Sequence, residues 1–371
     1  MGSIFLEVTA IIGLATILAI IFRLFKQPPI LAYVLTGIVV GPFGVMSLQH
    51  KEVLHAMGEF GITFLLFMLG LELKINELKS VGKVAIIAGF GQVLLTSFIG
   101  FLISLAFGFE IVTSIYIGIA LAFSSTILIV KLLSDKRDFN SLYGKITIGI
   151  LLVQDFVAIL ALIILAGFSS GEGLTPQVFI FSLFKGICLV AVIIGFSKTV
   201  LPSIVKHISH SSELLFLFSL AWVFGLAAFV SSPWIGFSIE IGGFLAGLSL
   251  ANSVQHFQIA SRIRSLRDFF ITIFFISLGM NMVFDNASEI IIPSILLSAF
   301  VLICGPLIVL IILGFLGQRK RTSFLAGITL AQISEFSLIL IFMGNKLGHL
   351  SESVVTLITI IAIITFITST Y

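Results

Sequence analysis

A succession of apolar runs, each about as long as a bilayer is thick, constrains this chain more than any other feature. A helix needs about 20 mostly apolar residues to cross the hydrocarbon core of a membrane. Only 10% of the 371 residues are charged, so a water-soluble fold could not hide so much apolar surface in a core. The sequence therefore predicts an all-α integral membrane protein that forms one transmembrane domain over residues 1–371. About thirteen segments are expected, at approximately 5–25, 29–46, 57–73, 83–107, 112–133, 144–167, 177–201, 213–230, 235–252, 266–284, 289–316, 323–345 and 351–371.

The basic residues test this count, because short cytoplasmic loops retain Lys and Arg. With thirteen spans, all of the 20 Lys and Arg residues except Lys51, Lys185 and Lys346 fall on one side of the membrane. A missed or invented span in the middle of the chain would scramble this asymmetry. We therefore expect a multi-pass protein of the plasma membrane with its N-terminus outside and its C-terminus in the cytoplasm.

Two pairs of segments resemble each other in a way that indicates an inverted repeat. The third and tenth share a Phe-rich run that leads to Leu-Gly, and the second and ninth share a Gly-x-x-x-Gly pair. Each pair is seven segments apart, and an odd offset turns the second copy upside down, as in many secondary transporters. We expect repeat one at about 1–167, a linker helix at about 177–201 and repeat two at about 213–371; chance similarity between Gly- and Phe-rich helices is the alternative. The matching positions are 64–70 with 274–279, and Gly37 and Gly41 with Gly243 and Gly247.

Polar residues interrupt the fifth and twelfth segments, which correspond in such a repeat. The fifth contains Ser124-Ser125-Thr126, and the twelfth contains Gln332-Ile333-Ser334-Glu335. Hydroxyl groups can satisfy backbone groups where a transmembrane helix is broken, and broken helices in matching positions of two halves point to a substrate site. The runs therefore predict two broken, crossing helices, unless their small residues only allow close helix packing.

Asp155 is the clearest candidate for a transport site, since it lies near the middle of the sixth segment beside Gln154. A carboxylate at the bilayer centre costs about 2.5–3.5 kcal/mol on insertion scales, and no basic residue is expected at a similar depth to pair with it. The ionised carboxylate offers oxygen ligands to a metal cation, whereas burial favours the protonated form. We therefore predict that H⁺ and a cation compete for Asp155. Gln154 either coordinates the same cation or faces a neighbouring helix.

Glu335 is a second carboxylate in mid-span. It either orients the broken helix by accepting backbone N–H bonds, which we favour, or provides a second proton site. Glu59 and Glu240 lie near helix ends on the predicted outer face. Either could line a funnel toward the site, but solvation at a helix end is the simpler expectation for both, as it is for Glu7.

The eleventh segment contains no Lys or Arg, only Pro293 and Pro306 as expected kinks. With one binding carboxylate and no compensating basic group, one-for-one electroneutral exchange is the simplest stoichiometry. The transported K⁺ or Na⁺ and H⁺ would be substrates. No cofactor is expected, since Cys188 and Cys304 lack the spacing of a metal site and no dinucleotide-binding fingerprint is present.

As a set, these residues resemble the Kef-type branch of the monovalent cation:proton antiporter families. The resemblance covers essentially the whole chain, and its motifs are specific together although each is weak alone. They are Gly41-Pro42, Glu59-Phe60-Gly61, the run from Phe67 to Leu73, Ser124-Ser125-Thr126, Gln154-Asp155, the run from Gly243 to Gly247, the run from Phe274 to Met280, and Ser334-Glu335-Phe336.

The resemblance implies a thirteen-helix antiporter fold with two crossed broken helices in a core domain, a dimerisation domain, and elevator-type movement. Electrogenic sodium-exchanging relatives carry Asp-Asp where this chain has Gln154-Asp155, and usually a Lys in the helix that corresponds to 289–316. Both differences favour K⁺/H⁺ exchange. Many Kef-type relatives continue into a cytoplasmic nucleotide-binding domain. We therefore expect this chain, which stops at Tyr371, to be a truncated form or a membrane-only member, with a cytoplasmic regulatory domain or subunit as a candidate partner.

The sequence leaves more than one transport function open. A K⁺/H⁺ antiporter is favoured, and the alternatives are a Na⁺/H⁺ antiporter of the same fold and a gated K⁺ efflux channel in which Asp155 is a gating charge. An intramembrane enzyme is not expected, because the chain lacks His-Glu-x-x-His, Gly-x-Ser-x-Gly and paired mid-membrane aspartates. Membrane lipid and a second copy of the chain are the expected partners, and nucleic acid is not.

Overall fold

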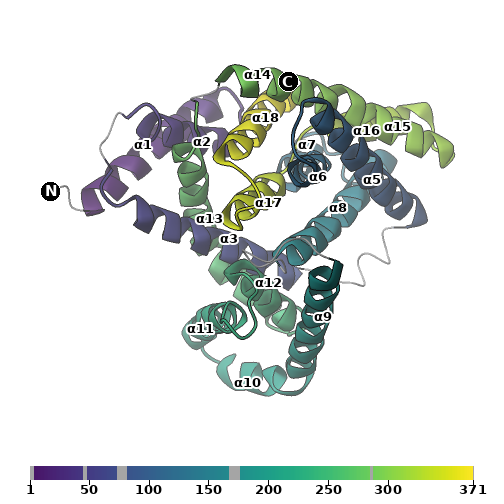
Figure 1. Cartoon of the computed structure of the whole chain (residues 1–371). Coiled ribbons are helices and arrows are strands. Elements are labelled where there is room, and N and C mark those ends of the chain that lie inside the picture. Colours follow the sequence, from purple (N-terminus) through teal and green to yellow (C-terminus); the bar gives the residue numbers. More distant parts are fainter. Residues whose placement is uncertain (1–3, 45–47, 73–81, 167–175, 285–286, 371) are drawn as a thin grey trace. The chain divides into compact units, whose positions relative to one another are not determined.

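The computed structural model describes residues 4–44, 48–72, 82–166, 176–284 and 287–370, which form helices joined by short turns (Figure 1). A helix or a pair of helices occupies each predicted segment. Seven helices of the described chain are long and apolar enough to cross a membrane, or eight if a bent pair counts as one. The all-helical membrane architecture is thus confirmed, and the count of thirteen crossings stays a prediction. Leu73 of the family motif, Tyr371, and Lys74 and Lys79, two of the basic residues expected on the cytoplasmic side, lie outside the described residues.

Contacts divide the chain into two compact units, each assembled from separate stretches. The first comprises Met1–Val8, Leu48–Lys74 and Ala161–Ser277, and the second comprises Thr9–Ser47, Ile75–Leu160 and Leu278–Tyr371. The first unit holds α3 (Lys51–Glu72), α9 (Pro176–Thr199), α10 (Leu201–Ile208), α11 (Ser212–Val230), α12 (Ile239–Leu250) and most of α13 (His256–Met280). The second holds most of α1 (Ile4–Leu24) and α8 (Leu142–Ala166), with α2 (Pro29–Val40), α5 (Lys83–Ala106), α6 (Ile111–Ala120), α7 (Thr126–Asp135), α14 (Ala287–Ala299), α15 (Gly305–Phe315), α16 (Lys320–Thr329), α17 (Glu335–Lys346) and α18 (Glu352–Thr370).

Some helix ends differ from the predicted ones. α2 ends at Val40 rather than near 46, because Pro42 has no backbone N–H and disfavours helical geometry in the residue before it. α3 and α13 begin at Lys51 and His256, earlier than predicted. Their first turns are polar, so an apolar pattern does not reveal them although the helical backbone continues.

The eleventh segment contains one irregular turn. A π-helical turn, Phe300–Cys304, separates α14 from α15. It ends two residues before Pro306, which cannot donate the hydrogen bond that would continue a regular helix. Pro293, the other predicted kink, lies inside α14.

In the first unit, α3 and α12 approach each other through glycines. A Cβ atom at Gly243 would lie 2.6 Å from the carbonyl oxygen of Thr63, and one at Gly70 would lie 2.8 Å from the backbone nitrogen of Leu248. Only glycine fits such backbone contacts. The pair is therefore held together by direct contact of two backbones.

The second unit contains the matching arrangement between α2 and the end of α13. A Cβ atom at Gly41 would lie 2.6 Å from Met280, and one at Gly279 would lie 3.0 Å from the backbone nitrogen of Ile38. The third predicted segment thus meets the ninth in the first unit, and the second meets the tenth in the second unit. The glycines that suggested the repeat in the sequence are the ones that form these contacts.

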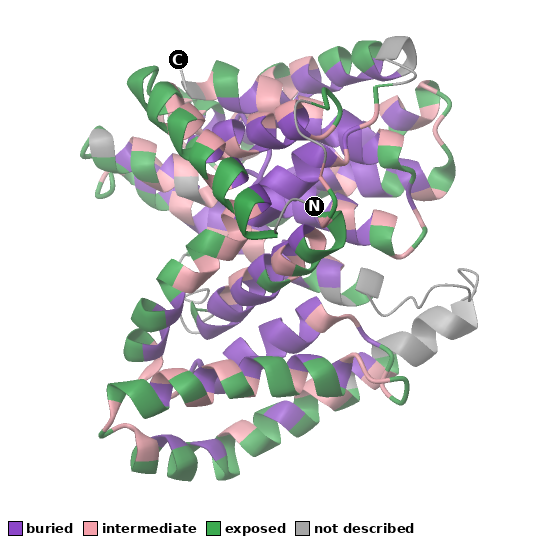
Figure 2. Ribbon diagram, turned by 90° about the vertical axis from the view of Figure 1, so that its left-hand side faces the viewer, coloured by how far each residue is buried: buried purple, intermediate pink, exposed green. Residues whose placement is uncertain are grey.

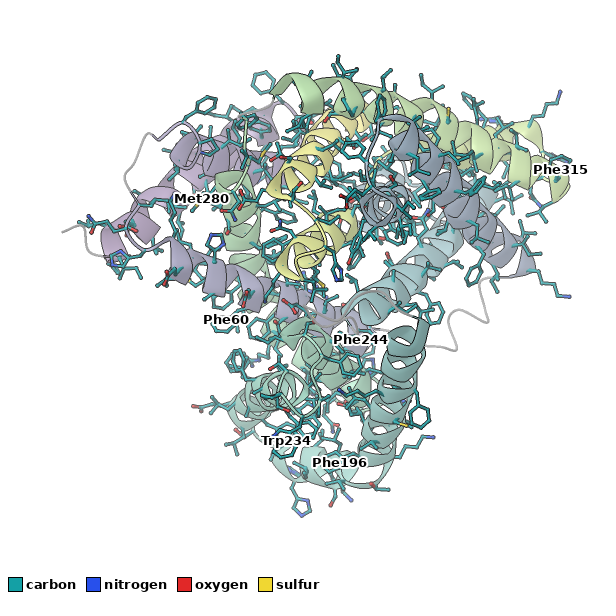
Figure 3. The ribbon with its side chains drawn as sticks, viewed as in Figure 1. Phe60, Phe196, Trp234, Phe244, Met280 and Phe315 are labelled. Atoms are coloured by element: carbon teal, nitrogen blue, oxygen red, sulfur yellow. The ribbon has the colours of Figure 1, made fainter. Side chains whose placement is uncertain are left out.

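The helices carry a buried face and an exposed face (Figure 2). The exposed faces are rich in large apolar side chains, such as Phe5 and Leu24 at the two ends of α1 and Phe315 at the end of α15. Phe315 points away from the neighbouring helices (Figure 3). Apolar surface of this extent is compatible with hydrocarbon around the protein rather than water, as expected for a multi-pass membrane protein.

Candidate functional site

The fifth segment is broken where the sequence predicted it. α6 ends at Ala120, and α7 begins at Thr126. Ser125 is buried and caps α7, since its side chain accepts a hydrogen bond from the backbone N–H of Leu128 at 3.4 Å. Serine is favoured at this position because its side-chain oxygen satisfies an N–H that the first helical turn leaves unpaired. The polar run therefore starts a new helix in the middle of the chain's apolar segment.

The twelfth segment is broken in the same way between Thr329 and Glu335. Ser334 caps α17 and forms a reciprocal pair with Ser337, in which each side chain binds backbone at the other position. Glu335 is the first residue of α17 and is buried. Its carboxylate lies at the helix end that carries positive partial charge, where an anion is stabilised.

Two hydrogen bonds join the breaks to each other. The Ser124 hydroxyl donates to the carbonyl oxygen of Leu330 at 2.9 Å, and the Ser337 hydroxyl donates to the carbonyl oxygen of Ala120 at 2.5 Å. Both acceptors are carbonyls that a continuous helix would have paired internally. The serines of each break thus satisfy backbone groups of the other, as broken transmembrane helices require.

Asp155, from α8, faces the start of α7. The Thr126 hydroxyl donates to the carboxylate, with its oxygen 3.2 and 3.3 Å from the two carboxylate oxygens. Asp155 is half-buried, and it is close enough to Glu335 to interact with it electrostatically. Two carboxylates, a hydroxyl and the starts of two half-helices therefore gather at the joined breaks.

Gln154 is buried beside Asp155, and both ends of its amide are used within the protein. Its oxygen accepts the backbone N–H of Ser124 at 2.9 Å, and its nitrogen donates to the side-chain oxygen of Gln92 at 2.7 Å. Of the two roles expected for Gln154, this geometry corresponds to facing a neighbouring helix.

Gln92, on α5, is the residue that the sequence reasoning missed. Its nitrogen donates to the carbonyl oxygen of Ala122 in the first break at 3.1 Å and to the Thr96 hydroxyl at 3.2 Å. The signal was present, because Gln92 is a buried amide within an apolar segment. Such a residue has to be paired, but the sequence does not say with which helix.

Two other expected site residues make their described contacts away from Asp155. The Gln332 side-chain oxygen accepts a hydrogen bond from the Ser369 hydroxyl of α18 at 2.5 Å, so this amide is directed toward α18. Glu59 is half-buried on α3 in the first unit, where it interacts electrostatically with His55.

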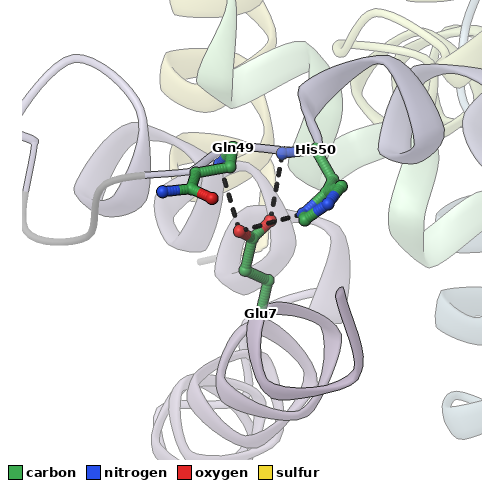
Figure 4. A network of polar contacts seen from close by, with 3 residues as sticks. All are labelled: Glu7, Gln49 and His50. Carbon is green, nitrogen blue, oxygen red and sulfur yellow. Dashed lines mark hydrogen bonds and ion pairs between the residues drawn. The ribbon is translucent and has the colours of Figure 1, made fainter. Parts of the chain in front are cut away.

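Two predicted solvent-exposed glutamates are instead buried. Glu240, the second residue of α12, is fully buried. Glu7 accepts the backbone N–H groups of Gln49 and His50 at 3.1 and 3.3 Å and contacts the His50 ring at 3.2 Å (Figure 4). The expectation of helix-end solvation was therefore wrong for both. At Glu7 the physical reason is that the carboxylate satisfies backbone donors just before α3.

Comparison with known proteins identifies the family. The family model described as "Sodium/hydrogen exchanger, transmembrane" matches residues 11–371. The chain belongs to this family. The match confirms the predicted resemblance, and members of such a family are transporters rather than enzymes.

Two curated relatives illustrate the range of the family. K(+) efflux antiporter 5 of Arabidopsis thaliana is 32% identical over 355 residues, which cover 93% of this chain and 61% of the relative. The ammonium/H(+) antiporter subunit AmhT of Alkalihalophilus pseudofirmus is 34% identical over 325 residues, covering 85% of this chain and 80% of that protein. The chain thus spans about three fifths of the length of the first of these relatives.

A solved structure shows the fold. The sodium proton antiporter MjNhaP1 of Methanocaldococcus jannaschii superposes with a TM-score of 0.66 over 98% of this chain and 94% of that chain, at 18% sequence identity. The predicted antiporter fold is therefore confirmed at the level of the backbone.

Proposed function

We propose that this chain exchanges a monovalent cation for protons, with Asp155 binding each in turn. The observation that supports this most is the carboxylate of Asp155 at a helix break, within hydrogen-bonding distance of the Thr126 hydroxyl. A carboxylate and a hydroxyl provide the oxygen ligands that hard cations prefer. A carboxylate inside a membrane protein is costly unless it has such a use.

Competition for one group couples the two fluxes. A cation bound to Asp155 requires the ionised carboxylate, and a proton removes both the charge and the ligand. The neighbouring Glu335 strengthens this alternation, because two nearby carboxylates repel each other when both are ionised. In the proposal, Ser124, Ser125 and Gln154 hold the backbone of the break in place around this pair, with Ser334 doing the same at the second break.

We further propose one-for-one, electroneutral exchange. Asp155 is the proposed cation ligand, and residues 289–316 contain no Lys or Arg whose proton could be exchanged in addition. The Gln154 amide, which occupies the position next to Asp155, has no charge to contribute. A current that accompanies exchange under a voltage clamp would contradict this stoichiometry.

K⁺ is the proposed substrate in preference to Na⁺. The support comes from the Gln154-Asp155 pair and from the relative named as a K(+) efflux antiporter. The solved structure of a sodium proton antiporter supports the fold alone. Elevator-type alternating access, a homodimer, a plasma-membrane location and a cytoplasmic C-terminus belong to the same proposal.

Purified protein in liposomes with an internal pH-sensitive dye tests the function. Imposed K⁺ or Na⁺ gradients should move protons in the opposite direction, more strongly with K⁺, and Asp155→Asn should abolish this movement. Asp268→Asn is the matched control, because Asp268 is exposed and paired with Arg267 on α13, with N–H groups 2.7 and 3.0 Å from its oxygen.

The result also separates an antiporter from a channel. In an antiporter, proton movement stops when the opposing cation is absent, and cation flux depends on the proton gradient. Retained coupled exchange in Asp155→Asn, with normal exchange in Asp268→Asn, would overturn the role given to Asp155. Cation flux that ignores the proton gradient would support the gated channel instead.

A further inference from the structure

A cavity of about 590 Å³ lies in the first unit, where α9, α10 and the turn after α12 meet. Two lysines line it, Lys198 from the last turn of α9 and Lys206 from the last turn of α10. None of the described residues that line the cavity is acidic. Its neutral polar lining comes from Ser197, Ser249, Asn252, Ser253 and Gln255.

The stretches that supply the described lining carry no negative side chain, and Glu213, in the first turn of α11, is the first acid after α10. Neither 175–212 nor 241–267 contains Asp or Glu. The same stretches supply further positive charge, including Arg262 and Arg264. Clustered charge of one sign in a cleft attracts an ion of the opposite sign.

A buried hydroxyl in this lining lacks a partner. Among the described residues, the Ser253 hydroxyl oxygen is buried and makes no hydrogen bond. The nearby Ser249 hydroxyl, by contrast, donates to the carbonyl oxygen of Ala246 at 2.7 Å and accepts from the Trp222 ring nitrogen at 2.9 Å. Buried polar groups are normally paired, and a rotation of the Ser253 side chain about its Cα–Cβ bond would bring this donor to an anionic oxygen in the cavity.

The walls of the cavity are fixed relative to each other. The Ser197 hydroxyl donates to the carbonyl oxygen of Ser249, which ties α9 to α12. The Phe196 ring stacks on the Trp222 ring with centroids 5.5 Å apart, and α10 leaves α9 at a bend of 47°. Lys198 and Lys206 are thus carried on connected elements rather than on a free loop.

We propose that this cavity binds a phosphate group, with Lys198 and Lys206 neutralising its charge and Ser253 donating to one of its oxygens. A lysine in the last turn of a helix is stabilised by the helix dipole, which explains each lysine alone. It does not explain why both line one cavity together with an unpaired hydroxyl and no acid. The predicted topology puts the cavity on the cytoplasmic side, so the phosphate is either that of an anionic lipid headgroup or free in the cytoplasm.

Native mass spectrometry of the detergent-solubilised protein tests the proposal with phosphatidylglycerol, diacylglycerol of the same chain length and inorganic phosphate as probes. Phosphatidylglycerol should bind more tightly than diacylglycerol. Lys198→Gln/Lys206→Gln should weaken it by roughly five-fold for each lysine removed, and Ser253→Ala by a smaller factor. Lys198→Arg/Lys206→Arg should retain binding because the charge is kept, and a melting temperature of the double Gln variant equal to that of the parent protein shows that its loss of binding is not misfolding.

Arg264→Gln is the matched control, because Arg264 is exposed on the same predicted side and does not line the cavity. Inorganic phosphate that displaces phosphatidylglycerol and shows the same dependence on the lysines would identify a soluble ligand; phosphatidylglycerol binding without such displacement would identify a lipid. Unchanged binding in the double Gln variant would overturn the proposal. Equal loss in Arg264→Gln would do so too, since it would mean attraction by surface charge in general.

Discussion

At the first helix break, the carboxylate that faces the new helix comes from elsewhere: Asp155 is on α8, while the break lies between α6 and α7. At the second break, the carboxylate is Glu335, the first residue of α17 itself. The second break is also closed by a reciprocal pair of serines, whereas the first has a single long capping bond from Ser125. The two breaks, which lie at matching positions of the predicted repeat, therefore differ in where the carboxylate comes from and in how the helix is capped.

The difference suggests which break changes during transport. A carboxylate on another helix can exchange Thr126 for an ion without disturbing the cap of α7. Glu335 cannot leave its place without removing charge from the start of its own helix. We therefore expect the first break to respond to the ion and the second to hold the geometry.

The largest expected effect separates the two carboxylates. Asp155→Asn should abolish cation-driven proton movement, whereas Glu335→Gln should slow it and lower the melting temperature, because the amide still accepts hydrogen bonds at the helix start but loses the charge interaction with the helix dipole. Liposome flux and thermal melting of both variants measure this. If Glu335→Gln melts like the parent protein but transports nothing, Glu335 is a second ion site and the two breaks are functionally alike.

The second-largest effect is expected for the amide pair Gln92 and Gln154, which binds the backbone of the first break. Gln92→Leu or Gln154→Leu should each destabilise the protein by about 1–3 kcal/mol, since each leaves buried partners unsatisfied. The double variant should lose less than the sum, because the residues bind each other directly. Chemical unfolding of the three variants gives the coupling.

Gln332→Leu is the control for the amide pair at the second break, where the single bond from Ser369 is lost. Strict additivity of Gln92→Leu and Gln154→Leu would mean that the two amides do not act together.

A smaller effect compares the two caps. Ser334→Ala should cost about 1 kcal/mol, a usual value for a helix N-cap, and Ser125→Ala should cost less because its bond is longer and unreciprocated. Melting temperatures of both variants, with Ser337→Ala to remove the other half of the pair, rank the caps. Greater destabilisation by Ser125→Ala would reverse the assignment of the second break as the more rigid one.

The smallest effect concerns α6 and α17, one half of each broken segment. His349, in the turn after α17, forms a 2.8 Å hydrogen bond with the Tyr116 hydroxyl of α6. Burial lowers the pKa of His349 below the ordinary value of 6.5. The unfolded chain therefore takes up a proton, as pH falls through 6.5, that the folded protein does not, and stability should decrease.

Melting temperatures between pH 8 and pH 5 should fall less steeply in His349→Gln than in the parent protein. Parallel pH profiles for the two proteins would show that this contact does not carry the pH dependence.

The breaks and Asp155 were predictable because lipid makes polar groups expensive. Ser124, Ser125, Thr126 and Asp155 stand out in any long apolar run, and a physical reason is needed for each. The sequence also contained the glycines of the helix contacts.

What could not be predicted is which helices meet. Gln92 was as visible as Gln154, but nothing in a single sequence gives the rotation of α5 relative to α8. The prediction that Glu7 and Glu240 are solvated was wrong for a related reason. The sequence around a carboxylate near a helix end is the same whether water or backbone N–H groups satisfy that carboxylate. The early end of α2 was overlooked although Pro42 gave a local signal.

The glycine contacts between α3 and α12, and between α2 and α13, have a consequence for movement. Helices that touch through side chains can slide past each other when those side chains change rotamer. Two backbones in direct contact have no side chains between them that could rearrange in this way. We therefore expect the two helices of each pair to move together as one rigid body. Whatever displacement carries an ion across the membrane must bend or shear the protein somewhere other than along these two lines.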